Sequence, residues 1–366
     1  MYNWQLKDWP QFKYDNTQLE ERLYTFAEKS GRIRGALKAI SQQDQLQATI
    51  DILVTEALKT SEIEGDYLSR EDVMSSIKNN LGFPVDKKIK DQNAKGMANL
   101  ITDVQNTYSD RLTEPKLFDW HKMIFPETKG ITVGQWRTHE EPMQVVSGRI
   151  DQPTVHFEAP PSQQVPFEMT HFIKWFNATA PKSTKAIIHA PIRSAISHLY
   201  FETIHPFEDG NGRIGRAIAE KAISQTVGYP VLLSLSAAID AKRNHYYDAL
   251  KEAQRSNEIT PWLNYFIDII LNAQDASEAL IDFTLKKTKL FDRYLNQLNA
   301  RQLKAIKRML REGSKGFEGG MTAKKYMRIT QTSKPTATRD LQKLLSLGVF
   351  KVDGDGRSTS YQLVLG

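Results

Sequence analysis

The 366-residue sequence contains no cysteine, which excludes disulfides and thiolate metal sites. It has no His-Glu-x-x-His segment either, so zinc chemistry is unsupported. No run of eighteen or more apolar residues is present, so no membrane-spanning helix is expected. The first residues lack the basic and then apolar pattern of a secretory signal. Together these absences predict a globular protein in the cytoplasm.

The residues that are present suit a large, well-packed molecule. Hydrophobic residues make up 40% of the chain, and its length suggests two or three domains. The net charge of +6 is unevenly spread, because residues 297–366 hold 14 lysines and arginines but five acidic residues. A tail of net charge +9 fits an anionic partner such as DNA, and it fits a solvated basic surface equally well.

Hydrophobic periodicity predicts a mainly α-helical chain in three segments. We expect an aromatic N-terminal segment packed on the core over residues 1–44, a helical catalytic domain over 45–296 and a small separate domain over 297–366. Residues 145–157 read as a β-hairpin, since two short extended runs flank a Ser-Gly turn. Helices are predicted over residues 18–39, 45–64, 93–107, 116–124, 167–177, 185–204, 213–226, 241–256, 261–271 and 275–296.

The tail has a recognisable order of elements. Helices are predicted at 300–312, 322–329 and 336–347, and strands at 349–352 and 359–364, joined by a turn at 353–356. This helix–helix–helix–hairpin order resembles a winged-helix module. The resemblance implies an α+β fold for the tail.

One twelve-residue segment combines groups that suit chemistry on a phosphate ester. Its sequence is His205-Pro206-Phe207-Glu208-Asp209-Gly210-Asn211-Gly212-Arg213-Ile214-Gly215-Arg216. A glycine-bounded turn that enters a helix presents backbone N–H groups and a positive dipole end to an anion. Arg213 and Arg216 lie on one face of that helix and suit phosphate oxygens. Asp209 is a hard ligand for Mg²⁺, and His205 is a base with a useful pKa.

The segment resembles the Fic motif, His-Pro-Phe-x-(Asp/Glu)-Gly-Asn-Gly-Arg-x-x-Arg, at every defined position. The resemblance covers roughly residues 45–275. It implies a Fic helical core, and transfer of AMP from ATP to a Ser, Thr or Tyr hydroxyl of a protein. His205 would be the base, Asp209 would hold Mg²⁺, and Gly210-Asn211-Gly212-Arg213-Ile214-Gly215-Arg216 would hold the phosphates. Gly212 favours adenylyl transfer, because a kinase branch of the family has lysine there.

Two further regions match the family more loosely. Tyr246, Tyr247 and Gln254 correspond to positions that line the base or ribose of the nucleotide in relatives, where asparagine commonly stands in place of Gln254. Packing in the core is the alternative for Tyr246. Val155, His156 and Phe157 correspond to the flap, a hairpin edge that can hold a target strand by β-augmentation, or else has a purely structural role. His198 reads as a core histidine.

A second short pattern suggests a built-in inhibitor. Thr60-Ser61-Glu62-Ile63-Glu64-Gly65 resembles the family's inhibitory pattern, (Ser/Thr)-x-x-x-Glu-(Gly/Asn), whose glutamate pairs with the second arginine of the motif. Glu64 is predicted at the C-terminal end of a helix, where the dipole disfavours an acid. Such a charge needs a partner, and Arg216 would be one. An exposed acid at a helix end is the alternative.

We therefore expect an autoinhibited protein adenylyltransferase that uses ATP and Mg²⁺ and acts on a protein substrate and on itself. An enzyme that also removes AMP is one alternative. A DNA-binding regulator whose Fic domain senses nucleotide is another. The target protein, the controlling signal and the oligomeric state, a homodimer included, stay open.

Overall fold

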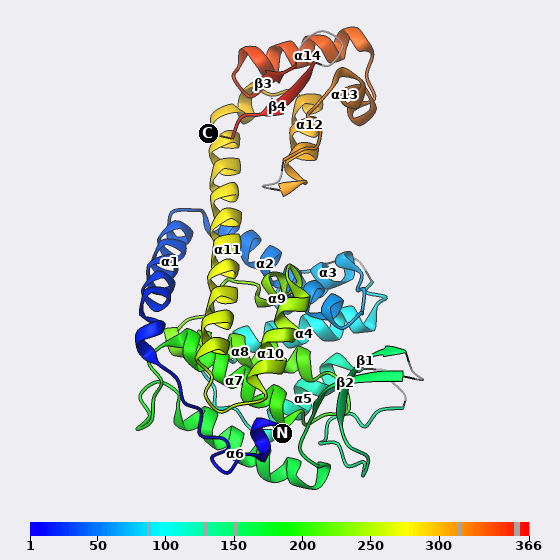
Figure 1. The fold of residues 1–366 in the computed structure, drawn as a ribbon. Coiled ribbons are helices and arrows are strands. Elements are labelled where there is room, and N and C mark those ends of the chain that lie inside the picture. The colour runs from blue at the N-terminus through cyan, green and yellow to red at the C-terminus, as the bar shows by residue number, and fades with distance from the viewer. Residues whose placement is uncertain (86–87, 127–129, 150–151, 314–315, 355–358, 366) are drawn as a thin grey trace. The chain divides into compact units, whose positions relative to one another are not determined.

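The computed structural model describes residues 1–365 apart from 86–87, 127–129, 150–151, 314–315 and 355–358. Its contacts divide the chain into two compact units. The first unit consists of Met1–Gly31 with Thr49–Asp275, and the second of Arg32–Ala48 with Ala276–Gly366 (Figure 1). Within the described residues no helix is both long and apolar enough to cross a membrane.

The chain is mainly helical, as expected. Two short 3₁₀ turns, Asn3–Gln5 and Asn16–Gln18, precede the first long helix. The first eleven α-helices among the described residues are α1 Glu20–Lys38, α2 Gln42–Ile63, α3 Arg70–Asn80, α4 Gln92–Asn106, α5 Glu114–Ile124, α6 Val165–Ala178, α7 Ala190–Ile204, α8 Asn211–Val227, α9 Leu235–Asp240, α10 Arg243–Ala253 and α11 Thr260–Tyr294 (Figure 1).

Helices α7 and α8 form the centre of the first unit. Every residue of α7 is buried, as expected of a helix that is surrounded by others. Pro191 stands in its first turn, where a missing N–H costs nothing. Helix α8 ends at Val227 and is capped by Gly228, whose φ of 83° is the left-handed conformation typical of a helix C-terminus.

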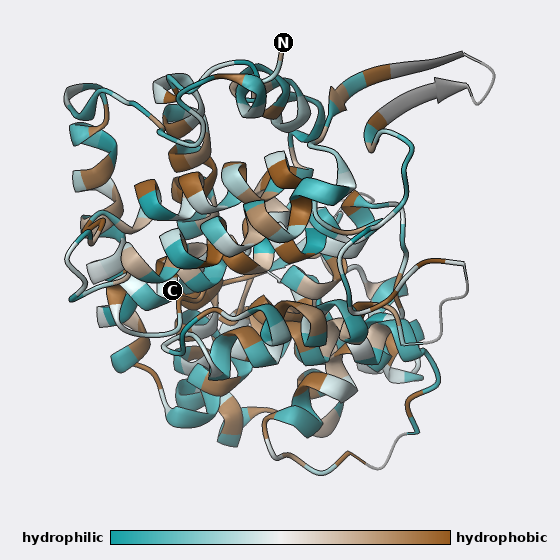
Figure 2. Cartoon of the chain, turned by 90° about the horizontal axis from the view of Figure 1, so that it is seen from below, coloured by the Kyte–Doolittle hydropathy of each residue, from teal (hydrophilic) through white to brown (hydrophobic). Residues whose placement is uncertain are grey.

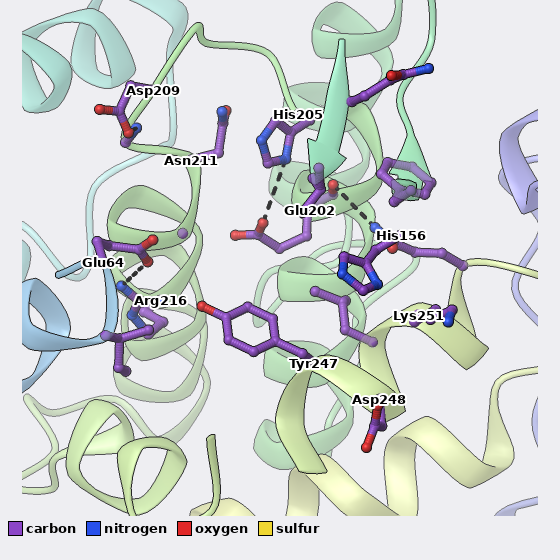
Figure 3. A pocket seen from close by; sticks show the side chains of 18 of the residues that line it. Glu64, His156, Glu202, His205, Asp209, Asn211, Arg216, Tyr247, Asp248 and Lys251 are labelled. Atoms are coloured by element: carbon purple, nitrogen blue, oxygen red, sulfur yellow. Dashed lines mark hydrogen bonds and ion pairs between the residues drawn. The ribbon is translucent and has the colours of Figure 1, made fainter. Parts of the chain in front are cut away.

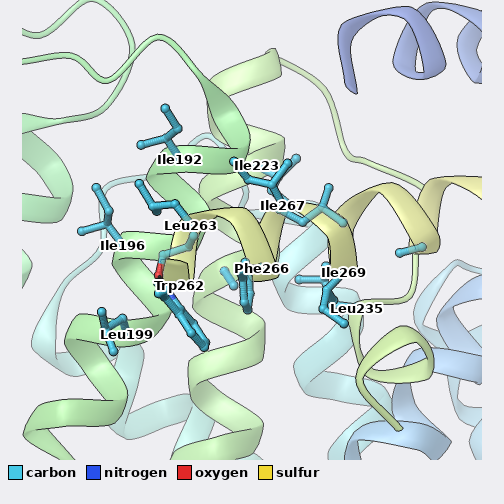
Figure 4. Packing of buried hydrophobic residues seen from close by; sticks show 14 of the residues in the cluster. Ile192, Ile196, Leu199, Ile223, Leu235, Trp262, Leu263, Phe266, Ile267 and Ile269 are labelled. Atoms are coloured by element: carbon cyan, nitrogen blue, oxygen red, sulfur yellow. Dashed lines mark hydrogen bonds between the residues drawn. The ribbon is translucent and has the colours of Figure 1, made fainter. Parts of the chain in front are cut away.

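The core of the first unit packs α11 against α7, α8 and α9. Figure 4 shows Trp262 and Phe266 of α11 beside aliphatic side chains of these three helices. The indole Nε1 of Trp262 donates to the carbonyl of Ala195 at 2.9 Å, which satisfies its buried polar atom. Hydrophobic and hydrophilic residues alternate around the helices (Figure 2), as expected when one face of each is buried.

A two-stranded antiparallel hairpin projects beside the motif loop, as the sequence predicted. Strands β1 Gln144–Arg149 and β2 Gln152–Glu158 pair in a register that joins Gln144 to Glu158. The register shifts between Val145 and Val146, so His156 is the extra residue of a β-bulge. We call this hairpin the flap.

The second unit has its own core and the predicted order of elements. Helices α12 Ala300–Leu310, α13 Ala323–Thr330 and α14 Lys334–Ser346 are followed by strands β3 Phe350–Asp353 and β4 Ser360–Leu363. The strands pair antiparallel, with Phe350 opposite Leu363. Part of the predicted turn at 353–356 lies outside the described residues. Buried Ile306, Tyr326 and Leu341, one from each helix, belong to one cluster.

The structure differs from the predicted helix boundaries in two places. The helices expected at 261–271 and 275–296 form the single helix α11 of 35 residues, because neither glycine nor proline interrupts residues 262–294. The helix expected from 185 begins at Ala190, since Pro191 fixes its first turn. By their contacts, residues 32–48 group with residues 276–366.

Candidate functional site

The motif segment connects α7 to α8 through a turn bounded by two left-handed residues. His205 caps α7 with φ 50° and ψ 60°, and Gly210 precedes α8 with φ 82°. Glycine adopts this conformation freely, but in a histidine it is uncommon and carries strain. A Cβ atom on Gly210 would also lie 2.6 Å from the side chain of Ile124. The turn at His205 therefore has to be held by its surroundings.

Arg137 is the residue that holds this turn. Its Nε donates to the carbonyl of His205 at 2.8 Å, and its backbone N–H donates to the carbonyl of Pro206 at 2.9 Å. The other guanidinium nitrogens donate to Ser162 Oγ and the Pro160 carbonyl, which follow the flap. Arg137 is 1% exposed, and burial lowers its pKa to about 10. The sequence analysis did not single it out, because a lone arginine 68 residues upstream of His205 forms no pattern.

Asn211 and Phe207 close the loop from inside. The Asn211 side chain accepts from the Phe207 N–H at 2.9 Å and donates to the Phe207 carbonyl at 2.8 Å. The Phe207 ring is fully buried and stacks on His121 with centroids 4.1 Å apart. The side-chain amide of Asn211 therefore bonds within the loop itself, and the buried Phe207 ring packs the loop against His121.

A cavity of about 760 Å³ lies between the motif loop, the end of α2, the flap and α10 (Figure 3). Most of the predicted site residues line it. These are Glu64, His156, Phe157, His205, Asp209, Gly210, Asn211, Gly212, Arg216, Tyr247 and Gln254. The remaining predicted residues, all described, are outside its lining: Val155, Arg213, Ile214, Gly215 and Tyr246.

Residues at the end of α2 bind the guanidinium of Arg216 through an ion pair and hydrogen bonds. Its Nη2 lies 2.7 Å from Glu64 Oε1, and Thr60 accepts two further hydrogen bonds, at Oγ1 from Nε and at the carbonyl from Nη2. The Arg216 side chain is 1% exposed and that of Glu64 28%. Burial alone would lower the pKa of Arg216, but the Glu64 carboxylate more than offsets this and raises it. Thr60 and Glu64, one helical turn apart, therefore act on one cation.

Gly212 makes room for this contact. A Cβ atom at position 212 would lie 2.3 Å from Glu64 Oε1 and 3.0 Å from Arg216 Nη1. The Glu64 carboxylate therefore lies directly against the backbone of the motif loop. It stands where the N-terminus of α8 would receive an anion.

Asp66 pairs with the other arginine of the motif, and the sequence analysis missed it. Arg213 Nη1 lies 2.8 Å from Asp66 Oδ2, and Nη2 lies 3.5 Å from Asp209 Oδ1. The Arg213 guanidinium also stacks on the Phe125 ring at 4.7 Å. Asp66 stands two residues beyond Glu64, so one short segment supplies a carboxylate to each motif arginine. That proximity to the inhibitory pattern is the signal that could have identified it.

The two neighbouring tyrosines face different surroundings. Tyr246 is 2% exposed, and its hydroxyl lies 2.7 Å from His198 Nε2. Tyr247 is 41% exposed and lines the cavity. Burial lowers the pKa of His198 to about 3, so its ring is neutral at pH 7, as expected of a core histidine. Gln254 faces the cavity and donates to the Glu202 carbonyl at 3.3 Å.

His205 and Glu202 share a buried corner of the cavity (Figure 3). His205 Nδ1 lies 3.8 Å from Glu202 Oε2. Burial lowers the pKa of His205 to about 4, and the nearby Arg137 guanidinium acts in the same direction, so the ring is neutral at pH 7. Burial raises the pKa of Glu202 to about 8. Gly215 allows this arrangement, since a Cβ there would lie 2.2 Å from Glu202 Oε1.

Asp209 could help to hold a divalent cation. Its side chain is 55% exposed and lines the cavity. The described residues contain no cluster of three or more potential metal ligands. Mg²⁺ commonly binds through one or two carboxylates together with the phosphates of a substrate. A single accessible carboxylate at a phosphate site fits that pattern.

The raised pKa of Glu202 gives a testable pH dependence of stability. Between pH 4.5 and about 8 the folded protein keeps the Glu202 proton that the unfolded chain loses, so rising pH favours unfolding, by at most about 1.4 kcal/mol per pH unit. Glu202→Gln removes this term. We expect the stability of Glu202→Gln relative to wild type to increase from pH 5.5 to pH 7.5 in urea denaturation. Parallel pH dependence of the two proteins would contradict the buried, protonated carboxyl.

Comparison with known proteins identifies the domain that carries this site. Residues 111–223 match the Fic/DOC family, and residues 2–83 match a domain of unknown function, DUF4172. The protein adenylyltransferase Fic of Aedes aegypti is 30% identical over 133 residues, which are 36% of this chain and 24% of that protein. That of Nematostella vectensis is 21% identical over 233 residues, 63% and 48% of the two chains. The chain thus spans less than half the length of either relative.

Solved structures support the same fold. A Fic family protein from Desulfovibrio desulfuricans G20 matches 94% of this chain and 96% of its own, with a TM-score of 0.51 at 19% identity. A Fic domain containing signaling protein from Bacteroides thetaiotaomicron matches 69% of this chain and 95% of its own, with a TM-score of 0.53 at 19% identity. The motif, the helical fold and the matched residues agree, and residues 111–223 carry a domain that matches the Fic/DOC family.

Proposed function

We propose that the protein transfers AMP from ATP to a hydroxyl group of a protein, and that Glu64 restrains this activity. The observation that carries the proposal is the shared cavity of His205 and Arg216, with the Glu64 carboxylate lying across the arginine. A volume of about 760 Å³ is within the usual range for small-molecule sites. The adenylyltransferase names of the relatives support the same reaction.

The reaction requires a group that accepts the proton of the attacking hydroxyl. The hydroxyl oxygen forms a bond to the α-phosphorus, the bond from that phosphorus to the bridging oxygen breaks, and pyrophosphate leaves. His205 is neutral at pH 7 and can accept the hydroxyl proton. Its Nδ1 faces Glu202, which leaves Nε2 for the substrate. Arg137 fixes the backbone that aims the ring.

The phosphates would lie at the N-terminus of α8. The backbone of Gly210, Asn211 and Gly212 lines the cavity there, next to the positive end of the helix dipole. Arg213 and Arg216 supply the cationic groups once their present carboxylate partners give way. Mg²⁺ held by Asp209 and the phosphates would neutralise charge on the leaving pyrophosphate.

Inhibition follows from the geometry of Arg216. A phosphate oxygen and the Glu64 carboxylate compete for the same guanidinium, which Thr60 holds in a fixed position. Asp66 competes in the same way for Arg213. ATP can then bind productively only when the end of α2 withdraws. We therefore propose that release of this segment is the activating step.

Removing the proposed base should abolish transfer. In a Glu64→Gly background, which lacks the inhibitor, we expect His205→Ala to reduce labelling from α-labelled ATP by about 10²–10⁴-fold, with ATP binding nearly unchanged. His156→Ala is the matched control, because His156 also lines the cavity. If labelling persists in His205→Ala but is lost in His156→Ala, the base is His156 and not His205.

Removing the proposed inhibitor should have the opposite effect. Glu64→Gly is expected to raise labelling strongly, including labelling of the enzyme itself, because it frees Arg216 for phosphate. The fold should survive, since Thr60 still bonds the guanidinium. Arg216→Ala should not mimic this gain, because it removes both the inhibitory contact and the substrate contact. The double variant should stay inactive.

Glu62→Gly is the matched control for this experiment. Glu62 lies on the same helical turn but pairs with Lys59 at 2.6 Å, so its substitution introduces the same glycine without freeing Arg216. Equal activity of wild type and Glu64→Gly across ATP concentrations would show that Glu64 does not inhibit. A gain in Glu62→Gly as large as in Glu64→Gly would assign the effect to helix disruption.

The second unit favours an additional function, binding of duplex DNA. Residues 297–366 carry a net charge of +9, and helix α14 follows α13 after a short turn at Gln331. The exposed face of α14 carries Lys334, Arg339 and Lys343. A basic helix of this kind, followed by a hairpin, suits phosphate contacts and a groove of DNA. We propose that this winged-helix-like unit docks on nucleic acid.

Salt and charge reversal test the DNA proposal. We expect the full chain to bind duplex DNA at low salt, with an affinity that falls steeply as salt rises. Arg339→Glu on α14 should weaken binding and reduce the salt slope by about one or more. Lys307→Glu, an exposed position on α12, is the matched control and should have the smaller effect. Absence of binding at low salt in a fluorescence anisotropy titration would contradict the proposal.

A further inference from the structure

The N-terminal segment, residues 2–15, runs along the connection between α10 and α11. Lys13 exchanges two backbone hydrogen bonds with it, donating to the Asn257 carbonyl at 2.7 Å and accepting from the Ile259 N–H at 2.9 Å. The Asn257 side chain donates to Asp8 Oδ1 at 2.9 Å. These bonds fix the course of the segment, so its first residues are held in place rather than free.

We call the end of the cavity that Gln254 lines, where the nucleotide base is expected, the base end. The first residues of the segment reach this end. The Asn3 N–H donates to the Gln254 carbonyl at 2.8 Å, and Asn3 is fully buried. Gln254 lines the cavity. The guanidinium of the next residue, Arg255, lies 4.2 Å from the centre of the Tyr2 ring. Residues 2 and 3 are therefore attached to the end of α10 by a hydrogen bond and a cation–π contact.

The same residues also hold the end of the flap. Trp4 Nε1 donates to the Glu158 carbonyl at 2.8 Å. The Tyr2 ring meets the Phe157 ring edge-on, with centroids 5.0 Å apart. Phe157 is 2% exposed and lines the cavity. One tripeptide thus contacts both the flap and the base end of the site.

The Trp4 bond occupies a particular edge of the flap. The Ala159 N–H donates to the Met143 carbonyl on the side of β1. Because consecutive residues of a strand direct their polar groups to opposite edges, the Glu158 carbonyl points to the edge that β1 does not cover. An extended peptide that adds to this edge would use that row of groups. Trp4 already occupies the Glu158 carbonyl, so an added strand cannot pair with that group.

We propose that residues 2–4 are a clamp that holds the flap against the end of α10 and sets where a target strand can begin to pair. The reference to a target strand rests on the proposed adenylyl transfer, whereas the clamp itself rests on the contacts above. The clamp gives a role to the matched domain of unknown function, residues 2–83. That domain would shape the target edge with residues 2–4 and supply Glu64, which directly follows its helix α2.

Amide hydrogen exchange tests the clamp without ATP or a target. Trp4→Phe removes the indole donor and keeps an aromatic ring, so we expect exchange in residues 155–159 to rise about two- to tenfold. Trp9→Phe is the matched control, because Trp9 Nε1 donates to Glu168 Oε2 on α6 instead of to the flap. Exchange in residues 190–227 should stay as in wild type for both. Unchanged exchange at 155–159 in Trp4→Phe would overturn the clamp.

A second variant guards against general unfolding by Trp4→Phe. Tyr2→Leu removes the ring contacts with Phe157 and Arg255 but keeps an apolar side chain. It should raise exchange at 155–159 as well, with residues 190–227 unaffected. If both variants raise exchange in the two regions equally, the segment stabilises the whole unit and is not a clamp on the flap.

The target side is tested by transfer between copies of the chain. The acceptor is the His205→Ala protein, and the donor carries Glu64→Gly with or without Trp4→Phe. We expect Trp4→Phe to lower labelling of the acceptor at least twofold with the KM for ATP unchanged, and Trp9→Phe to have no effect. Equal labelling would overturn the role in target pairing. A donor with Glu64→Gly alone that transfers nothing would count against the proposed function, while the exchange result would still decide the clamp.

Discussion

The guanidinium of Arg216 is almost completely removed from solvent, and a buried cation is stable only when anions or hydrogen-bond acceptors surround it. In this structure Thr60 and Glu64 meet that need. The requirement places the end of α2 against α8 and puts a carboxylate beside Gly212. A polyanionic ligand at the same helix N-terminus would satisfy the arginine equally well. The site is therefore built around one buried cation, whose present partners are Glu64 and Thr60.

The remaining geometry serves to keep that site fixed. His205 adopts a left-handed backbone conformation, and Arg137 ties it to the residues that follow the flap. Asn211 closes the loop on its inner side. Trp4 of the N-terminal segment donates to the Glu158 carbonyl at the end of β2. Chain segments that are distant in sequence thus converge on one loop, so loosening any of them would disturb the aim of the histidine.

Local patterns in the sequence account for most of the fold and for the centre of the site. The motif residues, the helix carrying Glu64 and the flap were all predicted, because each depends on short-range periodicity or on a compact motif. Helix α11 was divided in two, since a short polar stretch looks like a boundary when its packing is unknown. Arg137, Glu202 and Asp66 were missed, because their roles come from contacts across the fold and leave no mark in sequence spacing. The places of Tyr246, beside His198, and of Gly215, beside Glu202, also depend on contacts across the fold, so the sequence did not show that both lie outside the cavity lining.

Gly212 has a consequence for how this protein can change during evolution. The space that a side chain would need at position 212 is already occupied by the Glu64 carboxylate and bordered by Arg216. Any larger residue there would displace the carboxylate and change the surface at the N-terminus of α8 in a single step. Under the proposed function, a single substitution at position 212 would therefore alter both the phosphate site and the inhibitory contact. A lineage that acquires a new donor substrate through residue 212 would have to evolve a new means of control as well.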